Sequence, residues 1–438
     1  MKTNIDFIKG NTKHCLTTMM LPMIVAMFLN MAYNLVDSLW IGNLLGETAY
    51  AALTNSTPII LIMTSIAMGA TNGVSILLSH AIGAKNHKRM ESLISTSLII
   101  AIIFSLLITL VLEIFLPNIL TYLNTPAETY YMAYNYLSTY VLGYMFVYLY
   151  LYFTAVLRSF GNSIFQAVAM LVSTILNAIL DPIFIHFIGF YGASIATLLS
   201  QGVCLFFMVV YLKKKKLFSF HITYFNKADV FLLIQKAIPA IIQQSIPALS
   251  TTFLTALIST YSITAIVAYG VTGKLETILF YPAMALNMVL TTIIGQCIGG
   301  KRLDRANDYL KCALKYGCVL VLILSAIIVV FSKQLSGLFV NSSDVADIVS
   351  TYFSIVSIGY ILNTVVNSLL GVLNGFGKPA KSMMLMIFYY IVIRIPLAYL
   401  LSFLGFGLNG IWFSILISHI CAVIASTTIS LLQFKCEK

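Results

Sequence analysis

Two aspartates stand inside apolar stretches of this sequence, where a charged side chain is costly and usually has a function. Asp37 lies in AYNLVDSLWIG and Asp181 in LNAILDPIFI. Asn177 precedes Asp181 by four residues and therefore shares its helical face, and Pro182 cannot donate a hydrogen bond to the carbonyl of Ala178. Together these oxygens suit a hard cation or a proton shared between carboxylates. The alternative is structural: each aspartate sits at the outer interface or caps a neighbouring helix.

Three further charged side chains fall inside apolar segments in the second half of the chain. Lys274 and Glu276 lie two residues apart in VTGKLETILFYP, so they do not face each other on a helix. We expect them to take part in internal pairs within the C-terminal half. Arg394 likewise needs an internal partner, which the sequence does not identify.

Tyrosines are concentrated between residues 130 and 152. Those at the ends of this segment fit an aromatic belt at the membrane interface. Those in its middle either pack in the interior or line a cavity for lipophilic cations. The candidate cavity residues are Tyr33, Tyr140, Tyr144 and Tyr148.

Motifs of enzymes are missing. The six histidines show no HExxH spacing, and there is no GxSxG sequence and no phosphate-binding P-loop. The sequence therefore predicts a protein that is not an enzyme, has no bound cofactor and does not use ATP directly. Coupling to a transported ion, H⁺ or Na⁺, is the expected energy source.

The composition places these residues in a membrane. Of 438 residues, 60% are hydrophobic and only 9% are charged, whereas soluble domains carry about a quarter charged residues. Only helices or closed barrels satisfy the backbone in lipid, and a helix needs ~20 residues to span it. The sequence predicts an all-α polytopic protein with twelve spans: 16–41, 52–79, 93–115, 133–157, 164–187, 191–212, 232–260, 265–296, 309–332, 347–373, 380–402 and 407–434.

The positive charges predict the orientation. All but Lys274, Lys333 and Arg394 of the 25 Lys and Arg fall at one side of these spans, and such residues mark the cytoplasmic side. We therefore expect a multi-pass protein of the bacterial inner membrane with both termini in the cytoplasm. The net charge of +11 then reflects topology rather than nucleic-acid binding. The seven cysteines form no CxxC pattern and are expected to be free thiols.

An internal repeat divides the chain into two halves. LPMIV at 21–25 matches IPAII at 238–242, AIGAK at 81–85 matches CIGGK at 297–301, and RSFGN at 158–162 matches NGFGK at 374–378. The offset is about 216 residues. We predict an N-terminal six-helix lobe (1–212), a cytoplasmic linker loop (213–228) and a C-terminal six-helix lobe (229–438), with a site at the repeat interface.

These motifs together resemble the multidrug and toxic compound extrusion (MATE) family. The resemblance rests on VDSLWIG in helix 1, AIGAK after helix 2, LRSFGN after helix 4, LNAILDP in helix 5 and the 6+6 repeat. It implies two V-related bundles that alternate in access, and export of lipophilic cationic drugs or dyes in exchange for Na⁺ or H⁺. A lipid-linked saccharide flippase of the same superfamily is the alternative, but it would need several basic residues in the cavity. We expect a monomer that interacts with the lipid bilayer and binds no nucleic acid.

Within the family the chain resembles the DinF-like branch, because residues 239–260 contain no acid like that of the NorM-like branch. The resemblance places the cation-coupling site, which would also be the metal site if the ion is Na⁺, on Asp37, Asn177, Asp181 and Thr197. It assigns helix bending to Pro22. From the sequence alone, this mid-helix proline predicts a kink, either static or able to change during transport.

Overall fold

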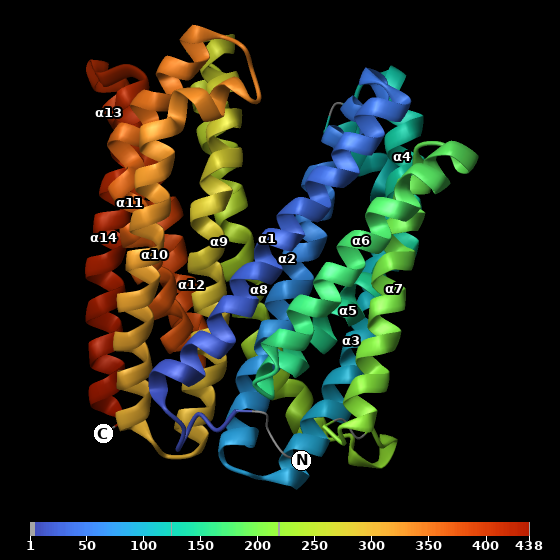
Figure 1. The fold of residues 1–438 in the computed structure, drawn as a ribbon, viewed down its shortest axis with the longest axis vertical. Helices are drawn as coiled ribbons and strands as arrows, with labels where there is room; N and C mark the ends of the chain where they lie inside the picture. The colour runs from blue at the N-terminus through green and yellow to red at the C-terminus, as the bar shows by residue number, and fades with distance from the viewer. Residues whose placement is uncertain (1–4, 124, 218–219, 438) are drawn as a thin grey trace. The chain divides into compact units, whose positions relative to one another are not determined.

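The structure, a computed structural model, describes residues 5–123, 125–217 and 220–437, and every regular element within these ranges is helical. Figure 1 shows the ribbon. The elements of the first half are α1 (Thr12–Leu45), α2 (Glu47–Gly83), α3 (His87–Tyr122), α4 (Ala127–Leu142), α5 (Tyr144–Ser159), α6 (Ser163–Ile188), α7 (Tyr191–Lys214) and the short η1 (Ile222–Tyr224). Those of the second half are α8 (Lys227–Ile258), α9 (Ile263–Gly299), α10 (Leu303–Gly337), α11 (Ser343–Gly375), α12 (Pro379–Ile387), η2 (Phe388–Arg394), α13 (Ile395–Leu401), η3 (Ser402–Phe406) and α14 (Gly407–Cys436).

The described helices account for twelve membrane spans. Ten helical segments are long and apolar enough to cross a bilayer, and α4 and α5 together form an eleventh that is bent by 50° at Gly143. The last segment runs over 58 residues, far more than the ~20 that one crossing needs. It is divided at Gly405 and Gly407, whose φ angles are 90° and 57°. The predicted fold, twelve helices in two sets of six, is confirmed.

The internal repeat is visible in the backbone as well as in the sequence. Lys85 and Lys301, Gly161 and Gly377, and Gly189 and Gly405 have positive φ values, and each pair is 216 residues apart. Glycine adopts this conformation without steric cost, which explains why it recurs where one helix ends and the next begins. The same turns therefore separate corresponding helices in the two halves.

The chain forms two compact units, and two helices are shared between them. One unit takes in Leu21–Ile241, and the other takes in Asp6–Met20 and Ile242–Lys438. Thus α1 changes unit next to Pro22, and α8 changes unit next to Pro239, its counterpart in the repeat. The predicted linker 213–228 lies inside the first unit, and its residues 218–219 lie outside the described ranges, as do 1–4 and 438 at the ends of the predicted lobes.

The first unit is held together at α2. This helix packs against α3, α4 and α5, and α7 packs against α4, α5 and α6. Gly69 and Gly73 of α2 let the backbone of α8 approach closely, because a Cβ atom on Gly69 would lie 2.4 Å from the Cα of Ile241. Near the start of α8, the buried Asp229 forms an ion pair with Arg89 and accepts a 2.6 Å hydrogen bond from Ser92 Oγ. These contacts fix the first part of α8 in this unit.

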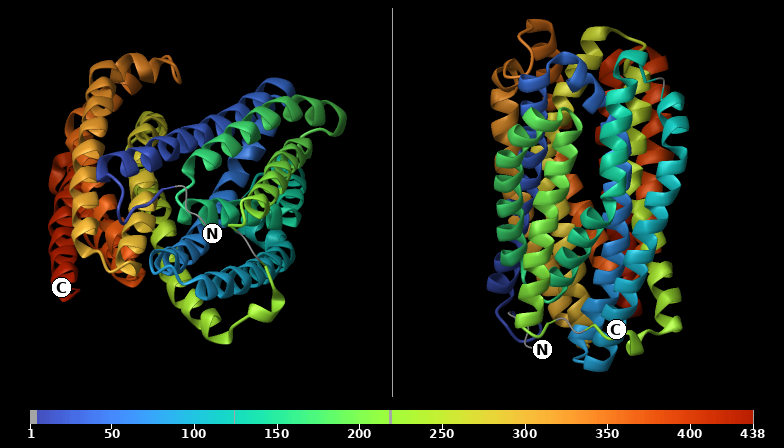
Figure 2. Two further views of the ribbon diagram at one scale, coloured as in Figure 1. Left: turned by 60° about the horizontal axis from the view of Figure 1, so that its bottom comes forward. Right: turned by 90° about the vertical axis from the view of Figure 1, so that its right-hand side faces the viewer.

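The second unit is built around α9 and α11. These two helices pack along their length, and α11 also contacts α10 and α14; the left view of Figure 2 shows the helices of this unit grouped together, coloured from yellow to red. Gly371 makes the close approach possible, since a Cβ there would lie 2.5 Å from the carbonyl oxygen of Asn287. The segment that precedes α1 belongs to this unit, where Tyr309 Oη donates a 3.0 Å hydrogen bond to the carbonyl oxygen of Phe7.

Candidate functional site

Three helices of the first unit bring the predicted cation-coupling residues into one buried region. Asp37 comes from α1, Asn177 and Asp181 come from α6, and Thr197 comes from α7. Asn177 and Asp181 are 0% exposed, Thr197 is 5% exposed and Asp37 is 8% exposed. Two acids are therefore enclosed inside a lobe whose outer surface is apolar, a costly arrangement that is typical of functional residues.

The amide of Asn177 binds one of the two carboxylates and lies near the other. Asn177 Nδ2 donates a 2.9 Å hydrogen bond to Asp181 Oδ1, as expected for side chains one helical turn apart. Asp37 lies within hydrogen-bonding reach of both Asp181 and Asn177. Residues 140 positions apart in the sequence thus form a single polar cluster, and the face-sharing predicted for Asn177 and Asp181 is present.

Oxygen atoms of this cluster remain without hydrogen-bond partners. They are Asp37 Oδ1, Asn177 Oδ1, Asp181 Oδ2 and Thr197 Oγ1. Buried polar atoms are normally paired. Four unpaired side-chain oxygens in one region could act as ligands for a hard cation such as Na⁺, or the acids could hold a proton between them. In the described part of the chain, no group of three or more His, Cys, Asp and Glu gathers as a metal site.

Tyrosines border the acids on the side of α1 and α4. The hydroxyl groups of Tyr33 and Ser200 are 3.1 Å apart, and Tyr33 also lies within reach of Thr197. Tyr136 and Tyr140 of α4 lie in the electrostatic surroundings of Asp37. Tyr33 and Tyr140, two of the candidate cavity residues, therefore adjoin the cation cluster.

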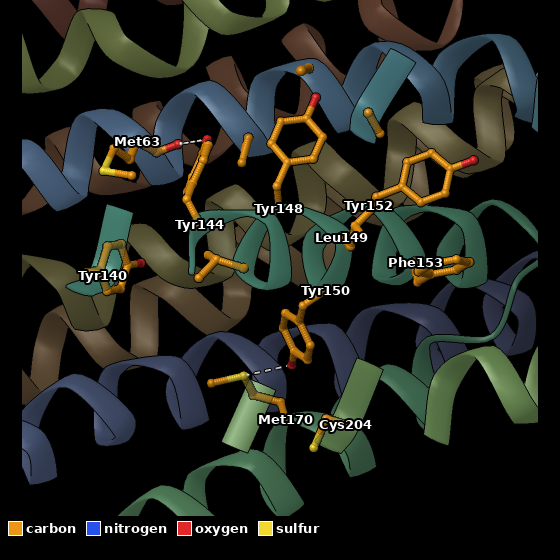
Figure 3. Packing of buried hydrophobic residues seen from close by; sticks show 14 of the residues in the cluster. Met63, Tyr140, Tyr144, Tyr148, Leu149, Tyr150, Tyr152, Phe153, Met170 and Cys204 are labelled. Atoms are coloured by element: carbon orange, nitrogen blue, oxygen red, sulfur yellow. Dashed lines mark hydrogen bonds between the residues drawn. The ribbon is translucent and has the colours of Figure 1, made fainter. Parts of the chain in front are cut away.

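The other two candidate cavity tyrosines lie in the packed interior of the first unit, as Figure 3 shows. Tyr144 is 0% exposed and donates a 2.8 Å hydrogen bond to the carbonyl oxygen of Met63. The ring of Tyr148 packs edge to face on those of Tyr144 and Phe104. In this conformation both side chains contribute to packing rather than to an open cavity.

The two prolines singled out in the sequence, Pro22 and Pro182, each lie inside a continuous helix. Pro22 lies in α1 and Pro182 in α6. The kink expected at Pro22 does not divide α1, whereas α4 and α5 are separated at Gly143. The sequence predicts a single span over residues 133–157 and does not predict that bend.

The charged residues of the second unit make internal contacts, as expected. Glu276 accepts hydrogen bonds from the hydroxyls of Tyr352 and Tyr360. Arg394 donates to Ser418 and stacks on aromatic rings. Lys274 Nζ lies 5.1 Å from the centroid of the Phe339 ring.

Comparison with known proteins identifies the family. The MatE family model matches residues 22–183 and 239–400, once in each half of the chain. The chain belongs to the MatE family. This is the family that the motifs VDSLWIG, AIGAK, LRSFGN and LNAILDP resemble. Its members are membrane transporters rather than enzymes. The two matched segments begin at Pro22 and Pro239, which agrees with the repeat seen in the backbone.

Relatives of the MatE chain cover nearly its whole length. A protein named "Probable multidrug resistance protein YpnP" from Bacillus subtilis is 28% identical over 431 residues and covers 95% of both chains. A protein named "FAD transporter" from Shewanella oneidensis is 26% identical and covers 97% of this chain and 96% of its own. A solved outward-facing multidrug resistance MATE family transporter superposes with a TM-score of 0.95 at 22% identity, covering 100% and 99% of the two chains. The bent form of the Vibrio cholerae transporter VcmN gives 0.92 at 24% identity over 97% and 98%.

Proposed function

We propose that this protein is an H⁺- or Na⁺-coupled antiporter that exports lipophilic cationic compounds by alternating access. The observation that carries the proposal is the pair of buried aspartates, Asp37 and Asp181, each with an unpartnered oxygen, in a region where Asn177 and Thr197 also have one. A cation or proton from outside the cell would neutralise this pair. The change in charge would alter the packing of α1 against α6 and so favour release of the drug.

The acids in the N-terminal unit support assignment to the DinF-like branch. Asp37 lies on α1 and Asp181 on α6, while the corresponding part of α8, residues 239–258, holds no Asp or Glu. An inward cation gradient can do work only through groups that bind the cation differently in two conformations. In this proposal those groups are Asp37, Asn177, Asp181 and Thr197, and Pro22 lets α1 respond to them.

The distribution of Lys and Arg supports an orientation with both termini in the cytoplasm of a bacterial inner membrane. Positive residues gather where α2, α7 and α9 end and the next helix begins: Lys85 and Lys88, Lys213–Lys216, and Lys301 with Arg302. We propose the monomer as the transporting unit, because each cluster described above is complete within one chain.

The flippase alternative receives less support. A lipid-linked saccharide carries an anionic pyrophosphate that needs several free cations. Of the two cations placed within the predicted spans, Arg394 already donates to Ser418 and Tyr389. Ethidium accumulation in cells distinguishes the two functions. Lower accumulation in expressing cells supports the antiporter, and unchanged accumulation together with a cell-wall precursor defect in a deletion strain favours the flippase.

A further inference from the structure

The second unit contains a carboxylate that is not part of the proposed ion-coupling site. Glu276 lies in α9 and is only partly buried. Its Oε1 accepts hydrogen bonds from the hydroxyls of Tyr352 and Tyr360, which are each 1% exposed. Among the described residues, none donates a hydrogen bond to Oε2. Two tyrosines thus orient the carboxylate and leave its second oxygen able to meet a ligand.

Aromatic rings surround this carboxylate. Trp412 of α14 stacks on Tyr269 with ring centroids 5.9 Å apart, and it meets Tyr352 edge to face at 4.8 Å. Phe280 packs edge to face on Tyr360 at 5.6 Å. Aromatic faces attract organic cations, and this attraction increases when the pair is removed from water. A negative group framed by such rings is suited to a lipophilic cation.

Open space lies beside α9 at Gly273, next to Glu276, and α9 is exposed one turn earlier at Gly270. A Cβ atom built on Gly270 or Gly273 meets no atom within 4 Å. Gly273 lies three residues before Glu276, so the two are neighbours on the helix surface. At Gly317 of α10, by contrast, a Cβ would lie 2.3 Å from a side-chain carbon of Leu286. The space beside the carboxylate is therefore not required for helix packing.

Arg394 contributes a positive charge without occupying the free oxygen. It donates hydrogen bonds to Ser418 Oγ at 3.0 Å and Tyr389 Oη at 2.7 Å, and its guanidinium lies 4.7 Å and 4.4 Å from the ring centroids of Tyr389 and Tyr390. The wide π-helical turn of η2, Phe388–Arg394, places these residues together. Such turns are rare and frequently occur at functional sites.

The repeat relates this arrangement to the N-terminal cluster. Tyr352 and Tyr360 lie 216 residues after Tyr136 and Tyr144, and Tyr136 lies in the electrostatic surroundings of Asp37. Both halves therefore place a tyrosine of the same repeat position near a carboxylate. The N-terminal half gathers two acids and further oxygens, which suit a small ion, whereas the C-terminal half offers one acid among rings.

We infer that Glu276 binds the positive group of the transported compound, with Tyr269 and Trp412 forming its aromatic frame and the space at Gly270 and Gly273 admitting the organic body. This inference rests on the proposed export of lipophilic cations. It assigns substrate binding to the second unit and ion coupling to the first. Glu276 is then a substrate-binding residue with no part in holding H⁺ or Na⁺.

Ethidium binding to the purified full-length protein, followed by fluorescence anisotropy, tests the assignment. Glu276→Gln keeps the shape of the side chain and an acceptor for both tyrosines, and we expect it to weaken binding by about tenfold or more. Gly273→Leu fills the open space and should weaken binding similarly, while the smaller Gly273→Ala should have little effect. Glu113→Gln, which alters a carboxylate of α3 that accepts from Ser138, is the matched control and should bind as wild type does.

The outcomes separate this inference from the proposed function. Equal ethidium affinity in the wild type, Glu276→Gln and Gly273→Leu overturns the inference, as does unchanged affinity accompanied by an altered response to Na⁺ or pH. If Glu276→Gln does not fold, the Gly273 pair decides. Failure of the wild type to bind ethidium overturns the proposed export of cations itself.

Discussion

Replacing Pro22 with alanine tests whether α1 bends at this proline during transport or whether Pro22 is only a static feature of the helix. Pro22 lies inside α1, next to the point where the helix passes from one compact unit to the other. A proline in a helix interior costs ~3 kcal/mol because it lacks the N–H group and crowds the preceding turn. Alanine removes this cost and favours the continuous helix by up to that amount. A bias of only ~1.4 kcal/mol already changes the ratio of two conformations tenfold.

We therefore expect Pro22→Ala to lose most gradient-driven efflux per folded molecule while its ethidium affinity stays within about twofold of wild type. Affinity and efflux are measured on the same purified sample, so that protein level does not enter the comparison. Pro239→Ala is a matched control, because Pro239 lies at the corresponding position of α8. That part of α8 carries no acid, so the control should retain more efflux. Unchanged efflux by Pro22→Ala would refute the bending of helix 1 and leave Pro22 as a static structural feature.

Three other perturbations test separate parts of the account. Asp37→Asn and Asp181→Asn keep the side-chain shape but remove a charge worth ~4 kcal/mol to a cation at ~4 Å. Each should therefore abolish gradient-driven dye efflux in proteoliposomes while the protein stays folded, and near-normal efflux by both would contradict the site. Arg89→Ala leaves a buried carboxylate without its ion-pair partner; because Arg89 is 35% exposed, we expect a loss of ~1–2 kcal/mol rather than the ~3–5 of a fully buried pair. Thermal unfolding measures that loss, and an unchanged midpoint would exclude a stabilising role. A cysteine introduced at Glu47 should react with an impermeant reagent added to intact cells, whereas one at Lys215 should react only after permeabilisation. Equal labelling of both in intact cells would refute the predicted topology.

The helices and the repeat could be predicted from the sequence because lipid imposes simple rules. Apolar runs must form helices in the bilayer, and charged loops mark where they end. The pairing of Asn177 with Asp181 followed in the same way from helical geometry. The position of Asp37 beside them required long-range packing, which the motifs indicated only through resemblance to a family.

Features that depend on contacts between distant helices had no local signal. Glu276 meets Tyr352 and Tyr360, which lie 76 and 84 residues away, and periodicity cannot identify such partners. The π-helical turn that brings Arg394 onto Tyr389 has an ordinary apolar sequence. The sharing of α1 and α8 between the two units was likewise not predicted, because the predicted boundary followed the charged segment 213–228, which precedes most of α8.

The most direct test of the central claim is ethidium efflux from proteoliposomes driven by a single imposed gradient. The wild type is measured with no gradient, with a Na⁺ gradient alone and with a pH gradient alone, and Asp37→Asn is measured under the same conditions. The account predicts that at least one gradient drives export by the wild type and that neither drives export by Asp37→Asn. Export by the wild type that is equally fast without any gradient, or gradient-driven export by Asp37→Asn, would contradict cation coupling through the N-terminal acids.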